Sequence, residues 1–111
     1  MAEYNKSMPI RYDVTTDVER KTLSIGTTAA NITFSQDLYA IEIANHSNNA
    51  VIYLEIDGST ATTSGGIPIY PRQYYSANKK IRVGDGIGLI SDKPNTDVRV
   101  RGHFELEPEN I

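Results

Sequence analysis

The clearest regularity in the chain is a strict alternation of residue types close to its C-terminal end. In VRVRGHFEL, residues 98–106, the even positions are apolar or glycine, and the odd positions are charged residues or histidine. Successive side chains of a β-strand point to opposite faces, so this alternation predicts a strand with one buried face and one face in water. The role of that wet face is the first functional question the sequence raises.

Short segments with the same period of two recur from residue 22 onward, and no segment has the period of a helix. LYAIEIAN, residues 38–45, places Tyr39, Ile41 and Ile43 on one face, and AVIYLEID, residues 50–57, places its apolar even residues on one face. NHSNN between them is rich in residues whose side chains replace backbone hydrogen bonds in turns. We therefore predict a hairpin over residues 38–57.

The remaining segments complete an all-β chain. DGSTATTSGG, residues 57–66, is a polar loop, and IPIYPRQYYS after it contains Pro68 and Pro71, which lack the N–H that a sheet ladder needs. These prolines predict an edge strand or a corner crossing between sheets. About eight short strands predict an antiparallel, jelly-roll-like β-sandwich. Periodicity does not separate a sandwich from a closed barrel, but uneven strand lengths and the proline corner favour two packed sheets.

The chain of 111 residues is long enough for one domain with one core. We predict an extended N-terminal arm over residues 1–20, because this segment mixes charge, threonine and a single Met-Pro-Ile cluster without a sustained period. The sandwich domain then spans residues 21–107, and residues 108–111 form a short C-terminal tail. Since the N-terminal segment has no continuous apolar run, we expect neither a signal peptide nor a membrane span.

Charge and cysteine content narrow the classes of function. Eleven basic residues against fourteen acidic residues give a net charge of -3, so nucleic acid is not an expected partner. The chain has no cysteine, which excludes a disulfide framework and thiol chemistry. Asn5, Asn31 and Asn45 begin Asn-X-Ser/Thr triplets, which we expect to be unmodified because such triplets arise by chance in chains rich in Asn and Thr.

Residues with catalytic potential are few. His46 lies in a predicted turn and His103 on the outward face of the last strand, and we expect both to be solvent-facing structural residues. Asp57 and Asp85 each precede glycine, a common turn dipeptide, and neither stretch has the dense oxygen-ligand spacing of a calcium loop. We therefore predict a protein that is not an enzyme, with no catalytic residue, no metal and no cofactor.

Aromatic residues point instead to contact with another molecule. The seven tyrosines include Tyr70, Tyr74 and Tyr75, which surround Arg72. Tyrosine and arginine are enriched at interface hot spots, because a large ring is buried there while its hydroxyl still finds a hydrogen bond. The cluster fits an interface, and it fits equally a core edge that the tyrosines cap.

A basic stripe is the second predicted surface feature. Arg99, Arg101 and His103 would form it together with Lys80 and Arg82, if these lie on a neighbouring strand of the same sheet. Such a stripe suits an acidic protein surface or a sugar. We favour the simpler interpretation of a solvated face that prevents stacking on other sheets, because exposed charges add little affinity.

IEIANHSNNAVIYLEIDG, a Ser/Thr/Gly loop, GGIPIYPRQYY and a final VRVRGHFEL follow one another over residues 39–106. This order resembles small structural proteins of tailed bacteriophages, which pair an N-S-x-x-x-V-Y-(L/I) strand with a G-x-P-(I/L)-x-P-x-x-x-Y segment and end in an alternating V-R-V strand. In the family's tail relatives a glycine often follows the V-Y-L element, whereas Glu55 follows here. This departure weakens the resemblance to the tail proteins.

The resemblance implies a virion component that acts by binding, such as a capsid decoration, cement or staple protein. We expect a capsid staple that is made in the host cytoplasm and located on the capsid surface, with the major capsid protein as its partner. The arm would contact the shell through Met8, Pro9, Ile10 and Tyr12.

A homodimer is the second partner expectation, because two-fold self-association is the commonest oligomeric contact. The proposed interface is the edge formed by Tyr70, Arg72, Tyr74 and Tyr75. Two alternatives stay open: a carbohydrate- or receptor-binding β-sandwich, and a tail or neck accessory subunit. Sugar platforms favour tryptophan, which this chain lacks.

Overall fold

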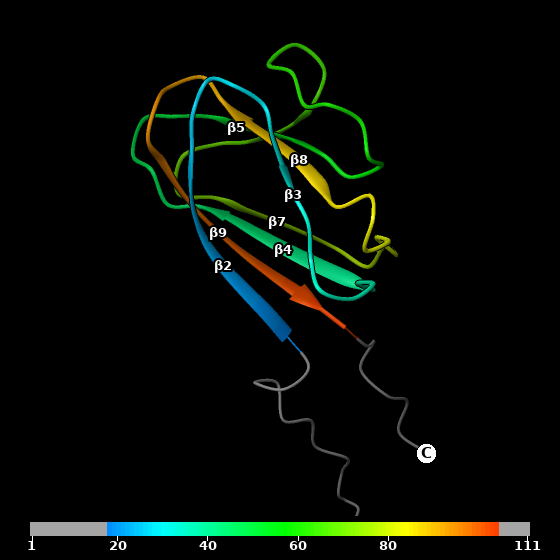
Figure 1. Cartoon of the computed structure of the whole chain (residues 1–111). Helices are drawn as coiled ribbons and strands as arrows, with labels where there is room; N and C mark the ends of the chain where they lie inside the picture. The colour runs from blue at the N-terminus through cyan, green and yellow to red at the C-terminus, as the bar shows by residue number, and fades with distance from the viewer. Residues whose placement is uncertain (1–17, 105–111) are drawn as a thin grey trace, which may run out of the picture.

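The computed structural model describes residues 18–104, which form two four-stranded antiparallel sheets. The strands are β2 (Val18–Ile25), β3 (Ala30–Ile32), β4 (Ala40–Asn45), β5 (Ile52–Glu55), β6 (Ile67–Ile69), β7 (Tyr74–Ala77), β8 (Ile87–Ser91) and β9 (Thr96–His103). One sheet has the order β2-β9-β4-β7 and the other β3-β8-β5-β6, and the two pack against each other (Figure 1). The predicted all-β antiparallel sandwich is confirmed, and residues 18–104 contain no helix.

Strands pair in a nested order along the chain. β2 pairs with β9, β3 with β8, β4 with β7 and β5 with β6. Successive pairs belong alternately to the two sheets. Each sheet is completed by one further pairing, β4 with β9 in one and β5 with β8 in the other. Among the described strands, only β5 and β6 are neighbours both in the chain and in a sheet, so the other connections cross between the sheets.

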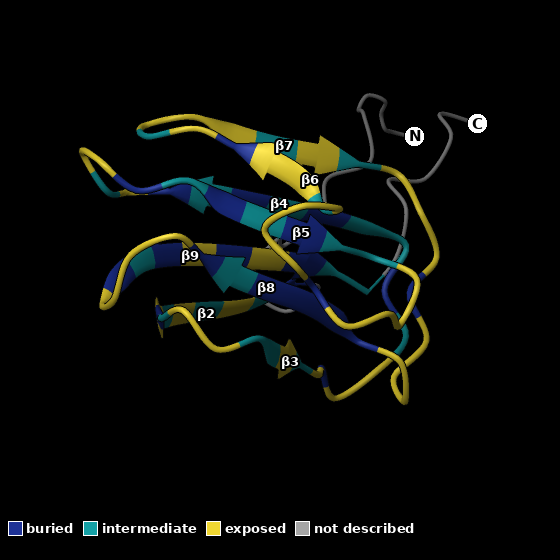
Figure 2. Cartoon of the chain, turned by 90° about the horizontal axis from the view of Figure 1, so that it is seen from above, coloured by how far each residue is buried: buried dark blue, intermediate teal, exposed yellow. Residues whose placement is uncertain are grey.

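The core lies between the sheets and follows the predicted alternation. In β9, Val98 and Val100 are buried while Arg99 and Arg101 are exposed. Figure 2 shows buried residues concentrated in the central strands and exposed residues at the sheet edges and loops. The largest fully buried apolar side chains are Leu38, Ile41, Ile43, Ile52, Leu54, Ile87, Leu89 and Val98. Burial of each such side chain stabilises the fold by about 1.5–3 kcal/mol.

The sandwich begins earlier than predicted. We expected the arm to extend to residue 20, but Val18, Glu19 and Arg20 are the first residues of β2. The alternation of apolar and polar residues is not visible at the start of β2, because the charged residues Glu19 and Lys21 occupy inward positions opposite Gly102 and Val100. The rest of the predicted arm, residues 1–17, and the predicted tail, residues 108–111, lie outside the described residues.

Glu19 is accommodated on that inward face by specific partners. Lys21 Nζ lies 3.1 Å from Glu19 Oε2, and the backbone N and Oγ of Ser35 donate to Glu19 Oε1 at 3.0 and 2.9 Å. Burial alone would raise the pKa of Glu19, but the hydrogen bonds from Ser35 and Lys21 outweigh it and hold this pKa below its ordinary value. Charged residues at inward positions therefore do not contradict a strand when such partners are present.

The predicted hairpin over residues 38–57 is wrong. β4 and β5 belong to different sheets, and NHSNN carries the chain from one sheet to the other. Asn45, which is 1% exposed, stabilises this crossing: its Nδ2 donates to the carbonyl oxygens of Ala50 at 2.8 Å and Ile69 at 2.9 Å. Its Oδ1 accepts from the backbone N of Ser47 at 3.0 Å and from Ser47 Oγ at 2.7 Å. Turn-forming residues specify a change of direction, but they do not specify whether the next strand stays in the same sheet.

The prolines and the polar loop behave as predicted. Pro68 lies in β6, an edge strand, and Pro71 lies in the crossing from β6 to β7. The loop of residues 57–66 packs over β8, where a Cβ on Gly88 would lie only 2.8 Å from the carbonyl oxygen of Ser59. Ala61 of this loop is 2% exposed. The loop thus covers part of the outer face of the β3-β8-β5-β6 sheet.

Both ends of the described chain lie at one end of the sandwich. Val18, the first described residue, pairs with His103, and Phe104 follows directly (Figure 1). The segments 1–17 and 105–111 are therefore attached close together, beside the edge strand β2.

Candidate functional site

The outer face of the β2-β9-β4-β7 sheet contains a shallow depression. Thr22 pairs with Arg99, Arg99 with Ala44, and Ala44 with Tyr74, so these residues form one row across four strands. Ala44 is small and lies between two large neighbours, which leaves a hollow in this row. The hollow has a volume of about 380 Å³, and we call it the outer-face depression. Its lining includes Arg20, Thr22, Ala44, Tyr74, Arg99 and Arg101.

The next row concentrates positive charge. Arg20 lies directly opposite Arg101, and Arg101 lies opposite Glu42 on its other side. Arg101 Nη1 is 3.5 Å from Glu42 Oε1, whereas within residues 18–104 no carboxylate forms an ion pair with Arg20. Like charges directly opposite each other on antiparallel strands destabilise a sheet. The Arg20–Arg101 pair therefore opposes folding, and Glu42 offsets part of the charge of Arg101.

Asp97 holds Arg99 in a fixed orientation. Arg99 Nε donates to Asp97 Oδ1 at 3.2 Å, and Arg99 Nη2 donates to Asp97 Oδ2 at 3.1 Å. These hydrogen bonds hold the pKa of Asp97 below its ordinary value, and the carboxylate in turn raises the pKa of Arg99. The pair is nearly half exposed, so it positions the guanidinium more than it stabilises the fold.

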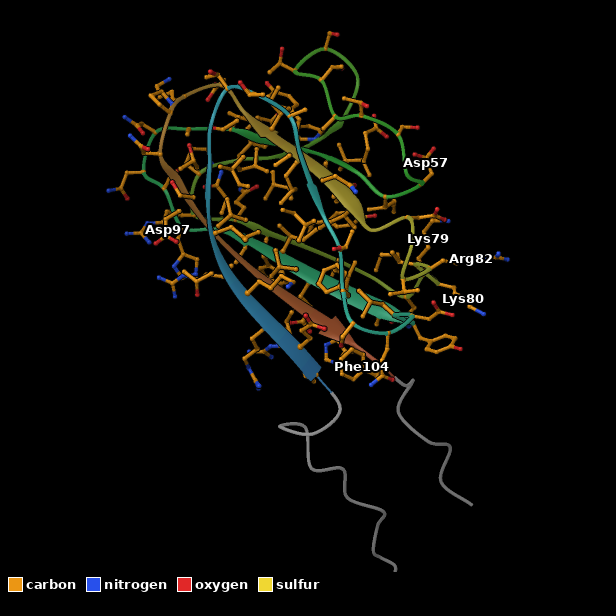
Figure 3. The ribbon with its side chains drawn as sticks, in the orientation of Figure 1. Asp57, Lys79, Lys80, Arg82, Asp97 and Phe104 are labelled. Carbon is orange, nitrogen blue, oxygen red and sulfur yellow. The ribbon has the colours of Figure 1, made fainter. Side chains whose placement is uncertain are left out.

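The predicted basic stripe is correct for β9 and wrong for its neighbours. Arg99 and Arg101 face water, and His103 Nε2 lies 3.4 Å from Glu42 Oε2 on the same face. Lys80 and Arg82 belong to the segment between β7 and β8, and Figure 3 places them at the opposite end of the sandwich from Asp97. There Lys80 Nζ lies 5.4 Å from the centre of the Tyr39 ring. The cation that completes the stripe is Arg20.

The predicted interface residues divide into two groups. Tyr70 and Tyr74 are exposed, at 52% and 72%, and Arg72 is exposed between them. Tyr75 lies opposite Ile43 and packs against the core, so it caps the core edge. The other predicted contact residues, Met8, Pro9, Ile10 and Tyr12, lie outside the described residues.

A tight turn brings Tyr70, Arg72 and Tyr74 to one corner. Gln73 N donates to Tyr70 O at 3.0 Å, and Arg72 has φ of 65° after Pro71, which is the geometry of a type II turn. Glycine or asparagine usually occupies the position that Arg72 takes. Arg72 N donates to Asn45 O at 3.0 Å, and Arg72 Nε donates to Asn48 Oδ1 at 2.9 Å. These bonds hold the corner against β4.

Among the described strands β7 is an edge strand, and none of them pairs with its outer side. Asn45 N donates to Gln73 O at 2.8 Å, and hydrogen-bonded pairs alternate along an antiparallel ladder. Tyr75 and Ala77 therefore direct their backbone groups toward β4, while Tyr74 and Ser76 direct theirs away from the sheet. Proteins protect sheet edges with charge, proline or short strands. β2 has charged residues, β6 has Pro68 and β3 has three residues, but YYSA of β7 has no charge and no proline.

Of the two histidines, His46 is exposed and lines the outer-face depression, and the side chain of His103 is 26% exposed beside Glu42. Asp57 and Asp85 lie in turns. Hydrogen bonds from the side chain and then the backbone N of Ser59, the latter at 3.0 Å to Asp57 Oδ1, hold the pKa of Asp57 below its ordinary value. Within residues 18–104, no group of three or more His, Cys, Asp or Glu side chains is arranged to hold a metal ion.

Sequence reasoning missed Arg20, Thr22 and Ala44 as members of the site. The period of two does continue backward through Thr22 to Arg20, and this was the available signal for a longer β2. The role of Ala44 depends on its neighbours across three strands, which the sequence of one strand does not contain.

Comparison with known proteins gives no match to a protein-family model and no match to a curated protein. In the described range no helix is long and apolar enough to cross a membrane.

Proposed function

We propose that the protein is a non-enzymatic virion structural protein that binds and stabilises a capsid shell, as a decoration or staple protein on the capsid surface. The observation that carries this proposal is the edge strand β7, whose outer side no strand within residues 18–104 covers, with Tyr74 72% exposed and the backbone groups of Tyr74 and Ser76 directed outward. An edge of this kind adds a strand from another molecule. The resemblance over residues 39–106 supports the choice of a phage shell as the setting.

The placement of the two sheet edges supports a bridging role. β2 and β7 are the opposite edges of one sheet (Figure 2), and β2 begins at Val18. Two copies that pair through β7 would carry their β2 strands on the two outer flanks. The proposed partners are therefore a second copy at β7 and the major capsid protein at the flanks, with Met8, Pro9, Ile10 and Tyr12 as contact residues.

The experiment uses empty shells assembled from a phage major capsid protein, chosen by a search of the coding sequences beside this gene. We expect the full chain to co-sediment with the shells at a fixed stoichiometry and to raise the temperature at which they disrupt. Deletion of residues 1–17, which leaves β2 intact, is expected to abolish co-sedimentation without loss of β-sheet circular dichroism. Deletion of residues 108–111 is the control and is expected to bind normally.

Two results would count against the proposal. Failure of the full chain to bind the shells would remove shell binding as the function. Normal binding by the chain that lacks residues 1–17 would remove the N-terminal segment from the mechanism and leave the sandwich as the contact.

We also infer a jelly-roll topology for the sandwich. The nested pairing of β2 with β9, β3 with β8, β4 with β7 and β5 with β6, alternating between two sheets, supports it. Jelly rolls have eight strands in two sheets and occur in viral capsid proteins and in lectins. The topology is therefore compatible with shell binding and with carbohydrate binding.

A carbohydrate-binding function is the second candidate, because the outer-face depression lies beside an exposed aromatic ring. Its volume of about 380 Å³ falls in the range of small-molecule sites, and Tyr74 forms one wall. Shell binding does not require this hollow, so the two functions can be tested separately.

A further inference from the structure

We propose that the outer-face depression binds an acidic saccharide, a pyranose with a carboxylate, such as a uronic or sialic acid. The carboxylate lies against Arg20 and Arg101, and the sugar ring lies over Ala44 against Tyr74. This inference specifies the ligand of the second candidate function and does not depend on shell binding.

Charge is the first argument. Arg20 has Arg101 directly opposite it, and its two diagonal neighbours on β9 are Arg99 and His103. Asp97 binds Arg99, and Glu42, which also lines the depression, contacts Arg101 and His103. Within residues 18–104 no carboxylate pairs with Arg20, so a bound carboxylate would supply a partner for Arg20, and guanidinium groups bind carboxylates with two parallel hydrogen bonds.

Orientation of the arginines is the second argument. Asp97 accepts hydrogen bonds from Nε and Nη2 of Arg99, so Nη1 is the nitrogen of this guanidinium that can donate to a ligand without displacing Asp97. Arg101 uses Nη1 in its contact with Glu42, at 3.5 Å. Asp97 therefore positions Arg99 before a ligand arrives, which lowers the cost of ordering this side chain on binding, and Glu42 restrains Arg101 more weakly.

Shape is the third argument. Ala44 separates Arg99 from Tyr74 in one row, so the hollow has a small floor between a cationic wall and an aromatic wall. Tyr74 is 72% exposed, and an aromatic face packs against the apolar C–H face of a pyranose. The volume of the hollow, about 380 Å³, suits a small ligand such as a single sugar unit better than an extended acidic peptide. The net charge of -3 disfavours a long polyanion such as nucleic acid.

The test is a titration of the full chain, followed by amide NMR, with glucuronate, galacturonate and N-acetylneuraminate. We expect saturable binding of at least one acid with Kd of about 1 mM, and shifts that include Thr22, Ala44 and Tyr74. Glucose and galactose, the neutral arm, are expected to bind at least about tenfold more weakly because they lack the charge-assisted hydrogen bonds.

Four results would overturn the proposal. Absence of saturable shifts with every acid would remove the site, and equal binding of neutral sugars would remove the role of the carboxylate. Acetate binding as tight as the acid sugars would reduce the site to a simple anion site. Tighter binding of an oligoglutamate peptide would reassign the face to an acidic protein partner.

Matched variants separate the site from the fold. Arg20→Gln is expected to weaken acid-sugar binding about tenfold, with an unchanged or higher melting temperature because it removes one of two opposed cations. Tyr74→Ala is expected to weaken binding of the same sugar. The controls are Arg82→Gln and Tyr70→Ala, which alter an exposed cation and an exposed tyrosine outside the depression.

If Arg20→Gln or Tyr74→Ala bound the acid sugar as tightly as the wild type does, the substituted residue would not contact the ligand. Shell co-sedimentation of Arg20→Gln is expected to be normal, whereas Tyr74→Ala is left out of that assay because Tyr74 belongs to the β7 edge. If the wild-type chain binds shells but no acid sugar, the saccharide proposal alone has failed. If it binds an acid sugar but no shells, shell binding alone has failed.

Discussion

At the scale of single residues, Gly86 shows how one missing side chain allows two segments to meet. Gly86 is buried and has φ of 63°, a conformation that residues with a Cβ rarely adopt. A Cβ at this position would also collide with the carbonyl oxygen of Ile32 in β3. Gly84 lies two residues earlier in the same turn, and a Cβ there would meet no atom within 4 Å.

We predict that Gly86→Ala destabilises the protein by at least about 1–2 kcal/mol, because alanine is strained at positive φ and displaces Ile32. Gly84→Ala is the matched control, and its effect is expected to lie within about 0.5 kcal/mol. Denaturant unfolding of both variants measures the difference. Equal stability of the two variants would show that the turn relaxes freely and that the approach to β3 has no energetic importance.

At the scale of elements, the crossing from β4 to β5 depends on one buried amide. Ala50 and Ile69 are 1% and 2% exposed, and their carbonyl oxygens both accept from Asn45 Nδ2. A buried acceptor that loses its donor costs about 1–3 kcal/mol. Because Ile69 is the last residue of β6, the same amide also connects the crossing to β6.

We predict that Asn45→Ala lowers the free energy of unfolding by about 1–3 kcal/mol, since Ile69 O loses this donor and Ala50 O keeps only the 3.1 Å hydrogen bond from Ser47 Oγ. Asn49→Ala removes an exposed amide from the same NHSNN segment and serves as the control, with an expected change within about 0.5 kcal/mol. Thermal and denaturant unfolding provide the measurement. If Asn45→Ala lost no more stability than Asn49→Ala, water would replace the amide and the crossing would have another cause.

The sequence predicted the elements better than their arrangement. Alternation in residues 98–106 and the prolines at 68 and 71 correctly indicated β9, an edge strand and a sheet crossing, because these signals are local. The prediction that β4 pairs with β5 was wrong, because sheet membership depends on contacts such as that of Asn45 with Ile69, which is 24 residues away. Arg20 was assigned to the arm because Glu19 and Lys21 occupy inward positions that a local pattern reserves for apolar residues.

The candidate site was predictable only in part for the same reason. Arg99, Arg101 and Tyr74 were singled out by residue type, and all three line the outer-face depression. Their grouping around Ala44 follows from the register of β2, β9, β4 and β7, which is set by the packing of the whole sandwich.

At the scale of the whole molecule, β7 offers a two-fold contact with a second copy. Tyr74 and Ser76 both direct backbone groups away from β4, so an antiparallel β7–β7 pairing places Tyr74 of each copy opposite Ser76 of the other. The two-fold axis then passes beside Tyr75, and the two four-stranded sheets form one continuous sheet. Such a pairing leaves both β2 edges at the flanks of the dimer.

We predict that the wild-type chain and Ser76→Ala sediment as dimers and that Ser76→Pro sediments as a folded monomer. Proline removes the outward N–H and its ring obstructs an added strand, whereas the ladder to β4 uses Tyr75 and Ala77 and is kept. Alanine alters the side chain and keeps the N–H, so it isolates the backbone contribution. Circular dichroism confirms the fold of each variant before sedimentation. A dimer of Ser76→Pro as tight as the wild type would place the contact elsewhere, and a wild-type monomer at high concentration, in solution and on shells, would exclude self-pairing through β7.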